Sequence, residues 1–226
     1  MPVMDEFKKE RESIKHAPFS EKLQYFADYY LLKLIVILFF GGVLISILVS
    51  ALSQKAPALY VAMVNFNSLK ESDSALWEPF AAEHINTRRE TIIMDHSSFI
   101  SSDENEINFL KYGYEDEQRL FSMVMTGEID LFISGEDVID RYVQQEWFDD
   151  LRHVLSTETL NRFEQQGRLV YRNEIPIAVT MDDSDLLKEY YFYNGRQGEA
   201  ICAGIPAGSM HHELAEQFMI YLLSSR

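Results

Sequence analysis

The stretch LIVILFFGGVLISILVSAL, residues 34–52, decides how this chain is organised. Its 19 residues carry no charge, and its only polar side chains are those of Ser46 and Ser50. As a helix rising about 1.5 Å per residue it would extend roughly 28 Å, about the thickness of the hydrocarbon core of a bilayer. A single segment cannot close a barrel, so only a helix satisfies its backbone in lipid. We therefore expect a membrane-spanning helix, because a buried core helix of this length would normally carry a polar stripe.

The charges on either side of this stretch predict its orientation. Residues 1–33 hold six basic and six acidic residues, whereas Lys55 is the only basic residue in the 15 positions that follow the stretch. Because basic residues are enriched on the cytoplasmic side, we expect a single-pass protein of the cell membrane with a cytoplasmic N-terminus and an extracellular C-terminal domain. A cleaved signal peptide is the alternative, because Val49-Ser50-Ala51 resembles a cleavage site, although the apolar run exceeds the usual signal core of about 7–15 residues.

Small residues recur along one face of the expected membrane helix. Gly42, Ser46 and Ser50 are spaced four residues apart. Small side chains at this spacing let two membrane helices approach closely. Self-association through this face is therefore one hypothesis, and a chance arrangement in a helix that tolerates Gly and Ser is the other.

The remainder of the chain is strongly acidic. The whole sequence holds 20 basic and 36 acidic residues, and the part from residue 53 onward holds 14 basic and 30 acidic ones, which is the full net charge of -16. Such a domain repels nucleic-acid phosphates and anionic membrane surfaces, so we expect no nucleic-acid partner. The single cysteine, Cys202, excludes an internal disulfide, and its apolar surroundings EAICAGIP predict a buried side chain.

Apolar runs alternate with amphipathic stretches after the membrane segment, which predicts an α/β domain with a largely parallel sheet flanked by helices. We divide the chain into a cytoplasmic segment 1–33, the span 34–52, a linker 53–57 and an outer domain 58–226. Strands are expected at residues 59–65, 90–95, 130–134, 169–172, 175–180 and 199–205. Helices are expected at 73–84, 107–126, 135–147 and 210–223, with weaker helices up to residue 166 and a helical turn from 182. Gly127 is the expected cap at the end of the helix 107–126, and Ser209 the expected cap at the start of the last helix.

Two stretches of the outer domain resemble a known family. Residues 118–151, QRLFSMVMTGEIDLFISGEDVIDRYVQQEWFDDL, resemble a segment of bacterial extracellular solute-binding proteins. That segment runs helix, Gly-Glu-Leu-Asp, apolar strand, small polar turn, helix, aromatic residue and Asp-Leu. Residues 181–223, with MDDSDLL and AGIPAGSMHHELAEQFMIYLL, resemble the same family's late segment, in which a short acidic helical turn and a strand precede a closing helix. The resemblance implies a type II periplasmic-binding-protein-like fold with two α/β lobes, a ligand cleft between them and no catalysis.

The same resemblance suggests where a ligand would bind. In that fold the contacts would come from loops at the carboxyl ends of strands, where helix N-termini point their amides outward. The corresponding residues follow the first three strands and are Asn65, Asn67, Ser97, Ser98, Ser134 and Gly135. The alternative is that Ser97 and Ser134 merely cap helices. About 170 residues follow the membrane stretch, fewer than the family usually has, so a second lobe could only be residues 136–180 and the cleft would be shallow or absent.

Catalytic and metal-binding patterns are weak in this sequence. Asp95, His96 and Ser97 are consecutive, whereas a catalytic triad needs its side chains to converge in space, and the sequence contains no GxSxG elbow. His211 and His212 would point about 100° apart on a helix, which disfavours joint metal ligation. Neither acidic run, 103–106 or 182–185, has the spacing of a calcium loop. We therefore expect no enzyme activity, no metal and no cofactor.

Two functions remain as hypotheses. The first is a reduced, membrane-anchored solute-binding-like domain that binds a small molecule or peptide outside the cell. The second is a degenerate binding domain that acts as an interaction or accessory subunit of a membrane complex. A groove walled by Asn65, Ser97 and Ser134 would favour the first, and a filled groove with an exposed apolar patch would favour the second.

Overall fold

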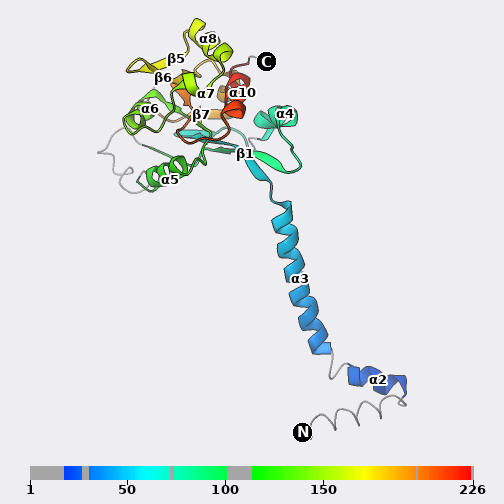
Figure 1. The fold of residues 1–226 in the computed structure, drawn as a ribbon. Coiled ribbons are helices and arrows are strands. Elements are labelled where there is room, and N and C mark those ends of the chain that lie inside the picture. The colour runs from blue at the N-terminus through cyan, green and yellow to red at the C-terminus, as the bar shows by residue number, and fades with distance from the viewer. Residues whose placement is uncertain (1–17, 27–30, 72–73, 101–113, 197, 225–226) are drawn as a thin grey trace. The chain divides into compact units, whose positions relative to one another are not determined.

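The computed structural model describes residues 18–26, 31–71, 74–100, 114–196 and 198–224 (Figure 1). The chain forms two compact units, Met1–Gln54 and Lys55–Arg226. The boundary between these units falls inside the linker predicted at residues 53–57. The apolar stretch and the acidic domain are therefore separate parts of the molecule, as their compositions suggest.

The first unit contains helix α2 (Phe19–Phe26) and the 22-residue helix α3 (Leu32–Ser53). Helix α3 includes the whole of the predicted stretch 34–52, and its residues 32–50 are not buried. It is long and apolar enough to cross a membrane. Gly42 has no atom of another part of the chain near the position of a Cβ, so the small-residue face is open. Its self-association stays a prediction.

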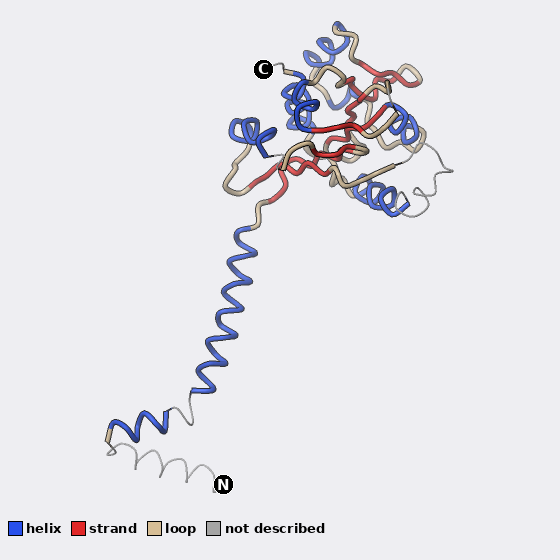
Figure 2. Tube along the Cα trace, turned by 180° about the vertical axis from the view of Figure 1, so that it is seen from behind, coloured by secondary structure: helices blue, strands red, loops and turns tan. Residues whose placement is uncertain are grey.

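The second unit is built on a six-stranded sheet in the order β3-β1-β4-β8-β6-β5. Figure 2 shows the strands in red, gathered in the second unit. The strands are β1 (Ala56–Met63), β3 (Glu90–Asp95), β4 (Leu131–Gly135), β5 (Leu169–Arg172), β6 (Ile175–Thr180) and β8 (Ile201–Gly204). Strand β1 pairs in parallel with β3 and β4, whereas the β4–β8, β8–β6 and β6–β5 pairs are antiparallel. Strands β3, β1, β4 and β6 therefore point the same way, so the sheet is mostly parallel in direction. A separate antiparallel pair joins β2 (Phe66–Ser68) to β7 (Tyr191–Tyr193).

Helices cover both faces of this sheet, because its central strands are apolar on both sides. In β1, Leu59, Val61 and Met63 enter one core cluster, and Ala62 enters the other. The first cluster includes side chains from α4 (Ser74–His84), α7 (Leu151–Val154), α8 (Thr157–Gln165), α9 (Asp185–Tyr190) and α10 (His212–Leu223). The second includes side chains from α5 (Tyr114–Met125) and α6 (Glu136–Val143). Figure 1 shows α5 and α6 on one side of the strands and α4 and α10 on the other.

Most predicted elements are confirmed, and three strands, β3, β5 and β6, have the predicted boundaries. The first seven residues of the helix predicted at 107–126 lie outside the described residues, and α5 covers the remainder up to Met125. Strand β1 begins at Ala56, three residues before the prediction. Pro57 is tolerated there because β4 pairs with β1 only from Val61 onward.

Two expectations about the outer domain are wrong. Ser209 does not cap the last helix, because α10 begins at His212 and the Ser209 hydroxyl donates to Asp130 Oδ1 at 3.0 Å instead. Residues 136–180 do not form a second lobe, because β5 and β6 belong to the same sheet as β1. The outer domain is thus one α/β unit, and the two-lobed arrangement that the family resemblance implied is absent from its described residues.

Gly127, the predicted helix cap, supplies a test of this packing. It ends α5 with a positive φ of 69°, and a Cβ there would lie 2.4 Å from the backbone oxygen of Gly208. Gly167 has a similar φ of 66° but nothing within 4 Å of a Cβ. We expect Gly167→Ala to lower the free energy of unfolding by about 1–2 kcal/mol through the left-handed backbone alone. Gly127→Ala should cost about 1–3 kcal/mol more, because backbone must move. Urea unfolding of the two full-length variants compares them, and equal losses would contradict the close contact.

Candidate functional site

Of the six residues predicted to contact a ligand, Asn65 and Asn67 follow β1, Ser97 and Ser98 follow β3, and Ser134 and Gly135 end β4. They do not face one common groove. Asn65 and Gly135 lie near the N-terminus of α6, and Ser97 and Ser98 lie around Asp95 at the end of β3. Asn67 is exposed on β2. One backbone hydrogen bond connects the groups, from the Asn65 amide to the Ser98 carbonyl at 3.1 Å. The chain folds these strand ends against one another.

The side chain of Asn65 is hydrogen-bonded to backbone groups of another segment. Its Oδ1 accepts from the Ile100 amide, its Nδ2 donates to the Ile100 carbonyl, and both distances are 2.8 Å. The residue adopts a left-handed φ of 66°, which asparagine tolerates better than most residues, and it is 6% exposed. Its side chain therefore fastens the segment after β3 to the end of β1, and its main polar groups are already bonded.

Ser134 and Gly135 are also committed to the fold. The fully buried Ser134 hydroxyl donates to the Val64 carbonyl at 3.2 Å, and the residue that caps α6 is Gly135, so the helix-cap alternative for Ser134 is wrong. A Cβ at Gly135 would lie 1.9 Å from the Tyr193 hydroxyl oxygen and 2.3 Å from Glu199 Oε1. Glycine is required here because two polar side chains approach its backbone closely.

Glu199 occupies the N-terminus of α6, where the fold resemblance would place a ligand. Its Oε1 accepts from the Asp137 amide at 2.7 Å, and its Oε2 accepts from the Tyr193 hydroxyl at 2.9 Å and from the Arg196 amide at 3.2 Å. Burial raises the pKa of Tyr193, and its hydrogen bond to Glu199 raises it further. A helix N-terminus attracts anions through its unpaired amides and its dipole. Here the chain supplies that anion itself.

A small polar cavity of about 190 Å³ lies beside Glu199. Its lining includes Asn65, Ile100, Asp137, Arg196 and Glu199. Arg196 and Asp137 form an ion pair across 2.6 Å, and the third charge in the lining, the Glu199 carboxylate, is bonded to two backbone amides and the Tyr193 hydroxyl. Cavities that hold drug-sized ligands have volumes of about 300–1,000 Å³. This cavity would accept only a small solute.

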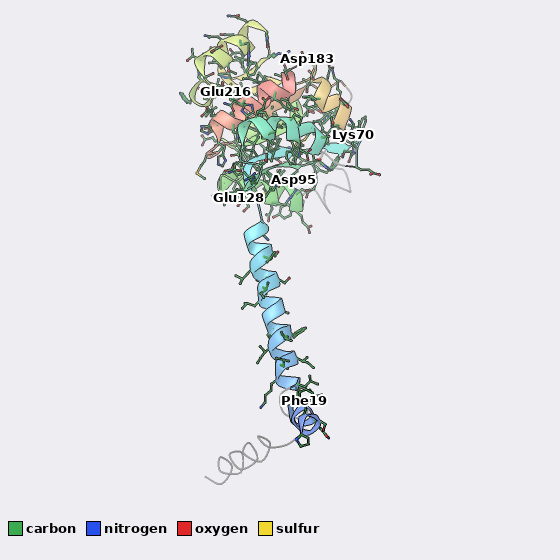
Figure 3. All side chains as sticks on the ribbon, turned by 90° about the vertical axis from the view of Figure 1, so that its right-hand side faces the viewer. Phe19, Lys70, Asp95, Glu128, Asp183 and Glu216 are labelled. Carbon is green, nitrogen blue, oxygen red and sulfur yellow. The ribbon has the colours of Figure 1, made fainter. Side chains whose placement is uncertain are left out.

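A second polar cluster surrounds Asp95, labelled in Figure 3. The Asp95 carboxylate accepts from the Tyr60 hydroxyl at 2.7 Å, from the Ser97 hydroxyl at 2.6 Å and from Arg119 Nη1 at 3.0 Å. Arg119 Nη2 also donates to the hydroxyls of Ser97 and Ser98. Burial by itself would raise the pKa of Asp95, but the hydrogen bonds from Ser97 and Tyr60 and the Arg119 charge lower it. The hydroxyls predicted to bind a ligand thus hold an ion pair in place.

Asp130 forms a third cluster, which the sequence did not reveal. It is 2% exposed and accepts from the Tyr60 amide at 2.9 Å, from the Ser209 hydroxyl at 3.0 Å and from His211 Nδ1 at 2.9 Å. Ser209 and His211 both bond to the carboxylate, so they do not form the serine–histidine relay of a hydrolase. The signal that could have found it is an acid placed directly before the apolar run of β4.

The remaining sequence candidates carry no site chemistry in this structure. Burial raises the pKa of Cys202 to about 12, which keeps its thiol protonated and unreactive. Within the described ranges, no group of three or more His, Cys, Asp or Glu side chains is arranged to hold a metal ion. The acidic run 103–106 lies outside those ranges, whereas Asp182 and Asp183 bond to the Ile201 amide and to Arg168.

Replacing Glu199 tests whether its carboxylate supports α6. Glu199→Ala removes the acceptor for three donors, and we expect the free energy of unfolding to fall by about 1–3 kcal/mol. Glu213→Ala is the control, because Glu213 is an exposed acid at the N-terminus of another helix, in the first turn of α10. Chemical unfolding of the full chain measures both. A Glu199→Ala loss no greater than that of Glu213→Ala would show that the carboxylate is dispensable.

The Asp95 cluster predicts a pH dependence. The folded-state pKa of Asp95 lies below its unfolded value of about 3.9, so its stabilising contribution is present above that pH and is lost as the pH falls through the folded pKa. Asp95→Asn should lower stability by about 1–3 kcal/mol at neutral pH and flatten the acid side of the stability curve. Asp183→Asn is the control, because its ion pair with Arg168 is solvent-exposed and worth about 0–1 kcal/mol. Equal losses in both variants would contradict the role given to burial.

Together these clusters bond most of the predicted ligand contacts to the protein itself. The arrangement can hold strand ends and helix starts in place, and a small polar cavity lies beside Glu199. No protein-family model, no curated protein and no solved structure matches this chain.

Proposed function

We propose that this protein is a membrane-anchored interaction domain, an accessory subunit of a membrane complex, and that it catalyses no reaction. Helix α3 is the anchor, the N-terminal segment is cytoplasmic, and the acidic α/β unit lies outside the cell membrane. The 22-residue apolar helix supports the anchor. The asymmetry of basic residues around it supports the orientation.

One observation carries the choice of an interaction domain over a solute-binding one. The N-terminus of α6 is occupied by the Glu199 carboxylate, whose Oε1 accepts from the Asp137 amide at 2.7 Å. A ligand anion would have to displace this carboxylate, and the displaced charge would then need a new partner. The side chains of Asn65 and Ser134 are likewise bonded to backbone groups. These contacts support an interaction domain in which the predicted ligand positions stabilise the fold.

Binding of a small solute is the second candidate, and the cavity of about 190 Å³ beside Asn65 and Arg196 favours it. The paired charges of Arg196 and Asp137 suit a small zwitterion, which could exchange with that ion pair. The two candidates differ in what stabilises the folded protein: a dissolved solute for the second, and a protein neighbour for the first.

The two functions are separated by thermal unfolding of the full chain in detergent with a library of sugars, amino acids, short peptides and divalent ions. A ligand present at 100 times its Kd stabilises the folded state by about 2.7 kcal/mol, which for a domain of this size raises Tm by roughly 5–10 °C. We expect shifts below about 1 °C. A rise in Tm of roughly 5–10 °C that is lost in the Asn65→Ala variant would contradict the proposed function and support solute binding.

The same chain should behave as part of an assembly in its own membrane. Crosslinking in intact cells is expected to give a discrete adduct with a second protein, and external protease is expected to remove the acidic domain. A chain that crosslinks to nothing, or whose C-terminal domain resists external protease while lysed cells lose it, would contradict the accessory role or the orientation respectively.

A further inference from the structure

Helix α5 carries three large apolar side chains on its solvent side. Tyr114, Phe121 and Met125 are 61%, 48% and 55% exposed. They are seven and four residues apart, a spacing that places them on one face of a helix. The buried side chains of the helix, Leu120 and Val124, lie on another face. Helix α5 is therefore apolar toward both the core and the solvent.

A groove of about 510 Å³ runs beside this exposed face. Tyr114, Gln118 and Phe121 form one wall, and Gln145 and Trp147, which follow α6, form the other. The Gln118 side-chain amide donates to the Tyr114 hydroxyl at 2.6 Å, which orients the tyrosine ring at the rim. The Tyr114 ring thus forms an aromatic edge of the groove.

The wall that contains Trp147 is built on aromatic stacking and is polar at one point. Trp147 is 1% exposed and stacks on Tyr142 with ring centroids 3.8 Å apart. Its ring also lies 6.1 Å from that of Phe121. The Trp147 indole N–H is buried and has no hydrogen-bond partner in the described residues. A buried tryptophan N–H normally finds an acceptor.

The charge around the groove is negative. Glu115, Asp116 and Glu117 form the first turn of α5, and Glu117 Oε1 accepts from the Tyr142 hydroxyl at 2.8 Å. The described basic side chains of α5 and α6, Arg119 and Arg141, already have partners, since Arg119 pairs with Asp95 and Arg141 interacts with the Tyr142 hydroxyl. A second copy of this chain would bring the same net charge of -16, so like charges disfavour a homodimer through this face.

We propose that the groove and the exposed face of α5 dock a basic amphipathic segment of a partner protein. The partner's apolar side chains would contact Tyr114, Phe121 and Met125, and its Lys or Arg side chains would face Glu115 and the groove-lining Glu117. Helices bind in this way to apolar grooves through side chains three, four and seven residues apart. This inference rests on the proposed function and names the surface and the kind of partner that the accessory role requires.

The test uses the full chain in lipid nanodiscs and a fluorescently labelled 18-residue amphipathic peptide made of leucine and lysine. Fluorescence anisotropy measures its Kd against a matched peptide in which glutamate replaces lysine. We expect the lysine peptide to bind and the glutamate peptide to bind at least tenfold more weakly. Phe121→Ser and Met125→Ser should each weaken the lysine peptide at least tenfold, whereas Phe121→Leu should retain binding.

Phe192→Ser is the matched control, because Phe192 is 56% exposed but lies on β7, outside the groove. Phe192→Ser should leave the Kd of the lysine peptide unchanged within about twofold, because it alters neither the groove nor the negative charge that attracts the peptide. Equal weakening by Phe192→Ser and Phe121→Ser would overturn the assignment, as would equal binding of the two peptides. A dimer of the full chain that Phe121→Ser dissociates would overturn it in favour of a second copy.

This test can fail without the proposed function failing. If the crosslinked membrane complex persists in Phe121→Ser while the peptide does not bind, the docking surface is elsewhere and the accessory role stands. If a small solute stabilises the chain through Asn65, the proposed function itself is wrong. Thermal unfolding of Phe121→Ser confirms that the exposed substitution leaves the domain folded.

Discussion

The Glu199 carboxylate connects most of the region in which the family resemblance predicted ligand binding. Its two oxygens join the start of α6 to Tyr193 at the end of β7 and to the turn that contains Arg196. The neighbouring residue supports the same contact, because the Ala200 carbonyl accepts from the Glu136 amide. Both of the first two amides of α6 are thus bonded by the segment before β8. This contact fixes the start of α6 beside the β4–β8 pair.

Asp95 and Asp130 follow the same principle in other parts of the domain. Each takes an acid out of water and surrounds it with donors from several elements, which makes its burial tolerable. Asp130 connects β1, β4 and the segment before α10, and Asp95 connects β1, β3 and α5. A domain with a large excess of acids therefore uses its buried carboxylates as connections between elements and leaves most of the remaining negative charge on its surface.

That surface charge and the exposed aromatic side chains of α5 suit different parts of one partner. The acids give long-range attraction to a basic segment, which speeds association, and the apolar contacts give short-range stability. The proposed membrane anchor would add a further effect. A domain fixed in the same bilayer as its partner meets it at a raised effective concentration, so a modest docking surface is enough.

The sequence by itself determined the apolar helix, the acidic domain, the order of strands and helices and the burial of Cys202, because these depend on local composition and periodicity. It did not determine the partners of Asn65, Ser134 or Glu199, because hydrogen bonds between residues far apart in the chain leave no periodic signal. Five of the six proposed ligand contacts lie at strand ends, whereas Asn67 is the middle residue of β2. Only the tertiary structure showed that most of the six bond to the protein. Only the sheet order, likewise, showed that β5 and β6 extend the first lobe, since strand pairing is a long-range choice that neither strand encodes alone.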